Sequence, residues 1–249
     1  MTASADSTWY QDAIQTVAPI NLPRLPMVFT SEYSQSPVDP LINLLGEADV
    51  VRSSVAHLLG PVDIALHSVL PSELSRRLRS NSEYVVGRSR LDVVWRLDNG
   101  RNLAALEFKR PYTVFPDEWS AAAVTSREQA EDVLHRSYDT DNETLLKGNA
   151  VMCGKQVHKY LLQTECTHIV LFDWRNMIGL ARDSPAGGRP GFDSVTAPLR
   201  WWAASEHYSA ESTSVPLQTV FTFRQALLSV LIDAVMTEDR VQRGESASR

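Results

Sequence analysis

The sequence predicts an α/β fold in which helices flank a mixed sheet. Three patterns in chain order support this: apolar residues at helical spacing over 41–59, two apolar runs joined at Asn99-Gly100, and a helical stretch over 149–163 followed by the apolar run THIVLFD. The implied order is a helix, a three-strand meander, a helix and a strand. Such an order needs a sheet with helices packed on its faces.

Length and charge limit the organisation and the partners. A chain of 249 residues suits a single domain, which we place at 41–239 between a proline-rich arm at 1–40 and a flexible tail at 240–249. The formal net charge is −6, so nucleic-acid binding would need a local basic patch. The arginines around 76–110 are candidates for one, although they could equally be ordinary solvated side chains.

The first half predicts two helices and a strand before the hairpin. The helix over 41–59 should end at Gly60-Pro61, and a second helical stretch should cover about 62–79. Pro71 could break that second stretch, with Ser72 as an N-cap. The residues 83–86 read as a short strand.

The hairpin carries the first chemical signal. If Asn99 and Gly100 form a two-residue type I′ turn, paired positions sum to 199 and Asp92 faces Glu107. Lys109 would share their face, and this face would also carry Val94, Arg96, Leu103 and Ala105. A three-residue loop with a bulge would shift the register and break this opposition.

Two acids directly opposed in a sheet are destabilising unless a cation or a shared proton lies between them. Two oxygen ligands at that spacing suit Mg²⁺ or Mn²⁺. The alternative is a solvated hairpin face on which Lys109 offsets two surface acids.

The second half predicts an excursion at 112–148 that includes an exposed helix over 126–135. A helix over 149–163, a buried strand over 167–173 and a strand over 177–181 should follow. A loop at 183–198, a strand at 219–223 and a helix over 223–236 complete the chain, with Trp201 and Trp202 packed on a flank.

Two motifs resemble a known family. Asp92, a hairpin and Glu107-Phe108-Lys109 resemble the D…ExK signature of the PD-(D/E)XK nuclease superfamily, although Leu91 replaces the usual proline. Gln156 and Tyr160 share a helix face and resemble the Q-hydrophobic-x-x-Y motif of the RecB-like branch. The likeness covers about 41–181, looks closest to fungal-type members with an LEFKRP strand, and implies a restriction-endonuclease-like core.

The resemblance implies roles for these residues. Asp92, Glu107 and the Phe108 carbonyl would bind Mg²⁺ or Mn²⁺, and Lys109 would orient the attacking water. Gln156 would hold that water or the lysine. Tyr160 would hold the substrate backbone, with help from Lys159, Arg90 and Arg110. Many members add an acid from the first helix, for which Glu47 is preferred here over Asp49 and Glu73.

The implied function is metal-dependent hydrolysis of phosphodiester bonds in nucleic acid, with DNA favoured over RNA. The alternative is a catalytically silent nuclease-fold protein that acts as a binding or effector module through a protein partner. The acidic net charge and Leu91 favour that alternative, whereas an intact Asp92, Glu107 and Lys109 favour the nuclease.

Other classes lack their signatures. The sequence contains no GxSxG, HExxH or GxxxxGK[ST] motif. Cys153 and Cys166 form no CxxC pair, which favours a reduced intracellular setting, nuclear or cytoplasmic. The sequence shows no secretory signal and no apolar run of the roughly 20 residues that cross a bilayer, so no membrane is expected.

Overall fold

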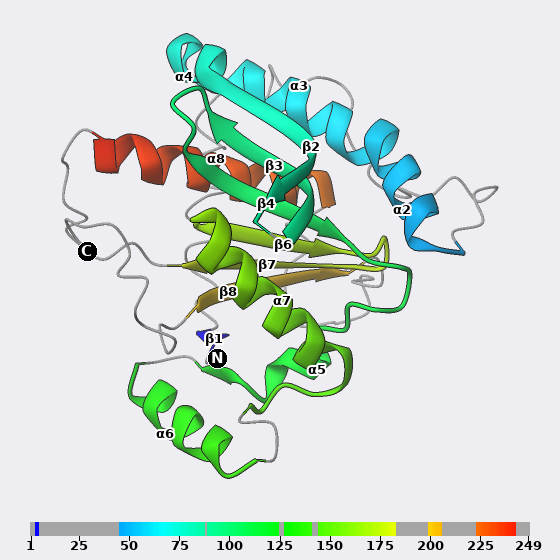
Figure 1. The fold of residues 1–249 in the computed structure, drawn as a ribbon, viewed down its shortest axis with the longest axis vertical. Helices are drawn as coiled ribbons and strands as arrows, with labels where there is room; N and C mark the ends of the chain where they lie inside the picture. The colour runs from blue at the N-terminus through cyan, green and yellow to red at the C-terminus, as the bar shows by residue number, and fades with distance from the viewer. Residues whose placement is uncertain are drawn as a thin grey trace, which may run out of the picture.

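The computed structural model describes residues 3–4, 45–87, 89–124, 127–140, 144–182, 199–205 and 223–242. Within these ranges the chain forms one eight-stranded sheet in the order β2-β3-β4-β6-β7-β8-β1-β5 (Figure 1). The long strands are β2 (Leu78–Val86), β3 (Ser89–Leu97), β4 (Asn102–Phe108), β6 (His168–Phe172), β7 (Asn176–Arg182) and β8 (Leu199–Ser205). Two-residue strands, β1 (Ala3–Ser4) and β5 (Ala123–Val124), extend the sheet beyond β8.

The strand pairing gives a mixed, mostly antiparallel sheet. Strands β2, β3 and β4 form an antiparallel meander, and β6, β7 and β8 form a second one. The two meanders join through the parallel pair β4 and β6. A parallel neighbour requires a crossover, which runs through α5 (Asp117–Ser120), α6 (Arg127–Tyr138) and α7 (Gly148–Thr164). The expected mixed α/β arrangement with flanking helices is confirmed.

The first helix does not end where the sequence predicts. A helix α2 (Glu47–Ser54) passes through a π-helical segment, Val55–Leu59, directly into α3 (Gly60–Val69). In the π segment the Gly60 N–H donates to the Val55 carbonyl, five residues back. Pro61 cannot donate to the His57 carbonyl, and Arg224 from the last helix supplies that bond at 2.7 Å. A distant side chain therefore lets the helix continue through Gly60-Pro61.

Further boundaries also move. The break at Pro71 is present, but Pro71 itself is the N-cap of α4 (Ser72–Arg77), not Ser72. Strand β2 begins at Leu78, five residues before the expected strand, because it pairs with the whole of β3 from Leu97 to Ser89. The helix predicted over 126–135 is α6, three residues longer at its end, and α7 matches its prediction within one residue at each end.

Helices cover both faces of the sheet. One face packs against α3, α4 and α8 (Phe223–Gln242), where Trp95, Phe108 and Phe172 join the aliphatic residues of α8 in one apolar cluster. The other face packs against α7 through Val94, Ala105 and Ile169. Figure 1 shows α7 in front of the sheet and α8 behind it. Helix α7 thus covers the face of the hairpin that carries the acids, so this face is not an open solvated surface.

The C-terminal part departs most from its prediction. Trp201 and Trp202 lie within β8, a strand that the sequence did not predict. Phe223 starts helix α8, which runs past the predicted end at 236 and into the first residues of the predicted tail. The predicted loop at 183–198, the predicted strand residues 219–222 and the tail beyond 242 lie outside the described residues, as does the arm at 1–40 apart from β1.

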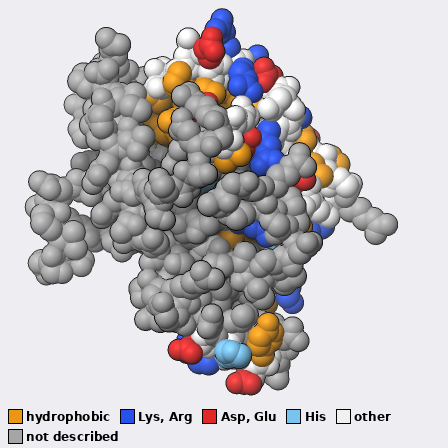
Figure 2. All heavy atoms as spheres, turned by 90° about the vertical axis from the view of Figure 1, so that its left-hand side faces the viewer, with side chains coloured by type: hydrophobic (Ala, Val, Ile, Leu, Met, Phe, Trp, Pro, Cys, Tyr) orange, Lys and Arg blue, Asp and Glu red, His pale blue; other side chains and the backbone are white. Residues whose placement is uncertain are grey.

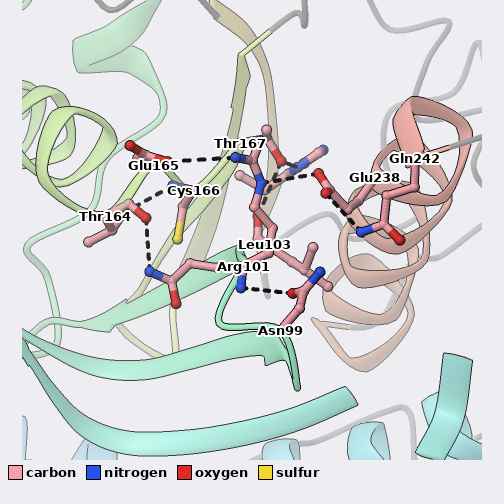
Figure 3. A network of polar contacts seen from close by, with 11 residues as sticks. Asn99, Arg101, Leu103, Thr164, Glu165, Cys166, Thr167, Glu238 and Gln242 are labelled. Carbon is pink, nitrogen blue, oxygen red and sulfur yellow. Dashed lines mark hydrogen bonds and ion pairs between the residues drawn. The ribbon is translucent and has the colours of Figure 1, made fainter. Parts of the chain in front are cut away.

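A polar network ties the start of β4 to two helices (Figure 3). Arg101 Nε donates to Glu238 of α8 at 3.2 Å, and its Nη1 lies 3.6 Å from Glu165, which ends α7 in the left-handed region. Asn102 Nδ2 donates to the Thr164 carbonyl at 2.9 Å. These bonds fix the N-terminal end of β4 against the helices on both faces of the sheet.

Among the residues that the structure describes, none of the helices has the length and hydropathy of a membrane span.

Candidate active site at the end of β4

The hairpin exists, but its turn is not the predicted one. The loop contains three residues, 98–100, because Leu97 N donates to the Arg101 carbonyl at 2.8 Å. Gly100 N donates to the Leu97 carbonyl, and Gly100 has φ 87°. Asn99 is not among the residues with positive φ, whereas a type I′ turn needs positive φ at both central positions. The turn is therefore a three-residue loop whose last residue is a left-handed glycine.

A bulge cancels the register shift that this longer loop introduces. Arg96 pairs with Asn102, but Trp95 pairs with Ala104, so Leu103 is an extra residue on β4. From Trp95 onward the pairs sum to 199, ending with Val93 opposite Leu106. One further step places Asp92 opposite Glu107, as predicted. Leu103 itself packs in the α8-side cluster and not on the acid face, which corrects that assignment.

Asp92 is half-buried and is fixed to the neighbouring strand. Its Oδ2 accepts a hydrogen bond from the Phe108 N–H at 2.7 Å. Burial raises the pKa of Asp92, and the Phe108 bond and Lys109 offset only part of that effect. The Asp92 carboxylate is thus held beside Phe108 through Oδ2, and this bond does not use Oδ1.

Glu107, Lys109 and Gln156 form one connected group. Lys109 Nζ donates to Glu107 Oε1 and to Gln156 Oε1, each at 2.8 Å. The Gln156 amide nitrogen donates to the same Glu107 oxygen at 2.6 Å. This pattern fixes the orientation of the Gln156 amide, since its oxygen faces an ammonium and its nitrogen faces a carboxylate.

The second oxygen of Glu107 has a different environment. Glu107 is 8% exposed, and its Oε2 is buried without a hydrogen-bond partner. Burial raises the pKa of Glu107 above its usual value, Lys109 opposes this, and Asp92 raises it further. A buried carboxylate oxygen without a donor is costly, so a cation or a proton at this position would be stabilising.

Tyr160 completes the group from the next turn of α7. Its hydroxyl accepts from the Gln156 amide nitrogen and donates to the Arg90 carbonyl at 3.2 Å. Burial raises the pKa of Tyr160, so its phenol stays neutral. Gln156 and Tyr160 therefore point together at the hairpin, as their spacing of four residues predicts.

The acids that the resemblance suggested from the first helices are not part of this hydrogen-bonded group. Asp49 caps α2 by accepting from the Leu45 and Gly46 N–H groups, and Glu73 pairs with Arg76 on an exposed face. Glu47 is exposed at the start of α2. Because the described residues contain no group of three metal-ligating side chains, none of these helix acids forms such a group with Asp92 and Glu107. The side chains of Arg90, Arg110 and Lys159 are exposed.

Sequence reasoning missed Glu83. Its neighbours in β2 pair as Ser82 with Val93 and Tyr84 with Leu91, which sets Glu83 beside Asp92. Glu83 has φ 54°, raises the pKa of Asp92 and accepts from Arg90 Nη2 at 2.6 Å. Only the pairing of β2 with β3 reveals this neighbour, because no local motif marks it.

Sequence reasoning also missed Asp173, which follows β6 and is fully buried. Its Oδ2 accepts from the N–H groups of Thr113 and Val114, and its Oδ1 accepts from those of Arg175 and Asn176. One carboxylate therefore joins the segment after Lys109 to the β6–β7 turn. Its position after a buried strand was the only signal in the sequence.

Charge is not separated on the flank that Figure 2 shows. Among the described residues there, Lys and Arg side chains are interspersed with Asp and Glu side chains. The described residues contain no group of three His, Cys, Asp or Glu side chains placed to hold a metal ion. Comparison with protein-family models, curated proteins and solved structures finds no match to this chain.

Proposed function

We propose that this protein is a metal-dependent nuclease that hydrolyses phosphodiester bonds, with DNA favoured over RNA as substrate. The proposal includes a core of the PD-(D/E)XK type, for which the mixed sheet, the β2-β3-β4 meander and the α7 crossover provide the order of elements. Mg²⁺ or Mn²⁺ is the proposed cofactor.

One observation carries the proposal: the buried, unpartnered Glu107 Oε2 lies in a group where Asp92 is the opposed acid. Lys109 and Gln156 both donate to its other oxygen. Carboxylate oxygens are the ligands that Mg²⁺ and Mn²⁺ prefer, so the donor set fits such an ion. Asp92, Glu107 and the Phe108 carbonyl would hold it.

The remaining groups have defined tasks in this proposal. A divalent ion held there would supply Lewis-acid chemistry: it would make a water more acidic and offset charge on the phosphate. Lys109 orients the attacking water and stabilises developing negative charge with its ammonium. Gln156 keeps that ammonium in place, since it accepts from Lys109 while donating to Glu107. Positive charge to attract the nucleic-acid backbone comes from the exposed side chains Arg90, Arg110 and Lys159. Tyr160 holds Gln156 in place by accepting a hydrogen bond from its amide nitrogen.

A second function is favoured by a specific feature. The described residues supply two opposed acids and no third ligand within one metal-holding group. Glu83, the third acid nearby, is engaged by Arg90. A catalytically silent module that keeps the nuclease fold to bind a partner would share this arrangement.

Manganese titration separates the two functions. Isothermal calorimetry on the purified chain should detect Mn²⁺ binding that Asp92→Asn and Glu107→Gln each abolish. Glu73→Gln, an acid on an exposed helix, is the matched control and should leave binding unchanged. The same preparation, given Mg²⁺ or Mn²⁺, should cut single- or double-stranded DNA.

The silent module predicts a different outcome. It requires that wild-type chain and Asp92→Asn give the same flat titration and that no divalent ion supports cutting. Binding of Mn²⁺ that survives both substitutions would also remove Asp92 and Glu107 as ligands.

A further inference from the structure

An exposed aromatic ring follows the candidate site along the chain. Tyr112 is 61% exposed, and its backbone has φ 63°, in the left-handed region. Bulky residues adopt this region rarely, and such outliers persist only where the surroundings hold them. An unfavourable backbone that presents a large ring to solvent invites a functional explanation.

The surroundings do hold this ring. Asp173 binds the two N–H groups that directly follow Tyr112 and also the N–H of Arg175, so one buried carboxylate fixes both segments. The Arg175 guanidinium lies 4.9 Å from the centre of the Tyr112 ring, and its Nη2 donates to the hydroxyl at 2.8 Å. The ring is thus pre-positioned before any ligand arrives, with a cation over one face.

The backbone that carries the ring follows directly from the proposed cutting centre. Lys109 N donates to the Phe172 carbonyl at 2.8 Å, which anchors the start of the same segment next to Asp173. Tyr112 is three positions after Lys109, so their Cα atoms are at most about 11 Å apart. Stacked nucleotides rise about 3.4 Å each along a strand, so this backbone separation corresponds to the span of roughly three nucleotides.

We propose that Tyr112, supported by Arg175, is a stacking platform for an unpaired base of a single-stranded nucleic-acid substrate. The inference rests on the proposed nuclease function and adds the form of the substrate. In a duplex the base faces are covered by their neighbours, whereas a single strand offers them to an aromatic ring. Arg110, exposed between Lys109 and Tyr112, would contact the backbone of the same strand.

The test is binding in EDTA, where metal-dependent cutting does not occur. A short fluorescent single strand carrying 2-aminopurine reports affinity by anisotropy and stacking by quenching. Tyr112→Leu should weaken binding at least about fivefold and remove the quenching, the loss expected for one base stack. Tyr112→Phe should stay within about twofold of wild type. Tyr138→Leu, which removes a 57% exposed tyrosine from α6, is the matched control and should change neither readout.

Two further measurements keep a folding defect apart from a lost contact. Tyr112→Gly suits the left-handed backbone, so its melting temperature should equal or exceed that of wild type while single-strand binding falls. Affinity for a closed duplex hairpin should be the same for wild type and Tyr112→Leu. Equal losses on single strand and duplex, or no loss on either, would overturn the platform.

The outcome is separable from that of the nuclease proposal. If Tyr112→Leu loses single-strand binding but wild type never cuts, the platform stands and the nuclease assignment fails. If wild type cuts and Tyr112→Leu binds single strands normally, the nuclease stands and the platform fails.

Discussion

Each end of β4 carries a cation paired with a glutamate, and the two pairs are buried to a similar degree. Arg101 precedes the strand and pairs with Glu238, and these side chains are 19% and 12% exposed. Lys109 follows the strand and pairs with Glu107, at 13% and 10%. Burial of charge therefore does not distinguish the two ends.

The difference is in how the carboxylates are satisfied. At the Arg101 end, Glu238 accepts from Arg101 with one oxygen and from Gln242 with the other. At the Lys109 end, both donors meet Glu107 Oε1, and Oε2 is the one carboxylate oxygen among the buried, unpartnered atoms of the described residues. The carboxylate at the first end is fully paired, whereas the carboxylate at the second end is satisfied only by a further cation or a proton.

Replacing each cation with methionine should give the largest difference in cutting rate between the two ends. Lys109→Met is expected to lower the cutting rate by at least about 100-fold, because it removes a donor aimed at developing charge. Arg101→Met should leave the rate within about threefold of wild type. Single-turnover cutting at saturating Mn²⁺ measures both, with circular dichroism to show that each variant is folded. Full activity in Lys109→Met would remove the lysine from the proposed mechanism.

The Arg101 pair should contribute measurably to the free energy of unfolding. Arg101→Met leaves Glu238 without its cation and should cost about 2 kcal/mol, between the values for exposed pairs and for fully buried ones. Urea denaturation measures this free energy of unfolding. Arg76→Met, at an exposed pair with Glu73, is the control and should change it by less than about 0.5 kcal/mol. An Arg101→Met variant as stable as Arg76→Met would mean that the clamp contributes little.

The glutamines at the two ends sharpen the comparison further. Gln156→Leu leaves Lys109 with Glu107 as its one partner, and the cutting rate should fall about tenfold through misplacement of the ammonium. Gln242→Leu removes the corresponding amide from Glu238 and should not change the rate. Single-turnover cutting at saturating Mn²⁺ measures both rates, and equal rates in the two variants would remove Gln156 from the positioning of Lys109.

The smallest expected effect is on the pH dependence of stability without metal. Burial raises the folded-state pKa of Asp92 and of Glu107, so the folded chain binds more protons than the unfolded chain above the ordinary carboxyl pKa. Their stabilising contribution is present at low pH and is lost as pH rises through the raised values. Asp92→Asn should therefore show a smaller fall in melting temperature between about pH 5 and pH 8, measured in EDTA. An equal or larger fall would contradict a raised pKa at Asp92.

Local patterns predicted the elements of the core well, and for physical reasons. Helical spacing of apolar residues placed α7, and the dense apolar run placed β6, because burial on both sides demands those patterns. The opposition of Asp92 and Glu107 was also predicted, but from a turn that does not form. The opposition is kept because the three-residue loop shifts the register of the two strands by one residue, and the bulge at Leu103 shifts it back.

Other features depended on groups far apart in the chain. Pro61 stays within a helix because Arg224 satisfies the carbonyl that the proline cannot. Glu83 reaches Asp92 only through the pairing of β2 with β3, and Asp173 meets its partners only where two loops converge. Nothing near Glu83 or Asp173 in the sequence reports these partners.

The sequence by itself determined the order of the main helices and strands as far as β7, the hairpin, and the helix face shared by Gln156 and Tyr160, since each follows from a local period or turn. The tertiary structure alone decided which carboxylate oxygen lacks a donor, which acid stands beside Asp92, and where the Tyr112 ring is held. Those outcomes depend on desolvation and on hydrogen-bond partners that long-range packing brings together, and no local pattern encodes either.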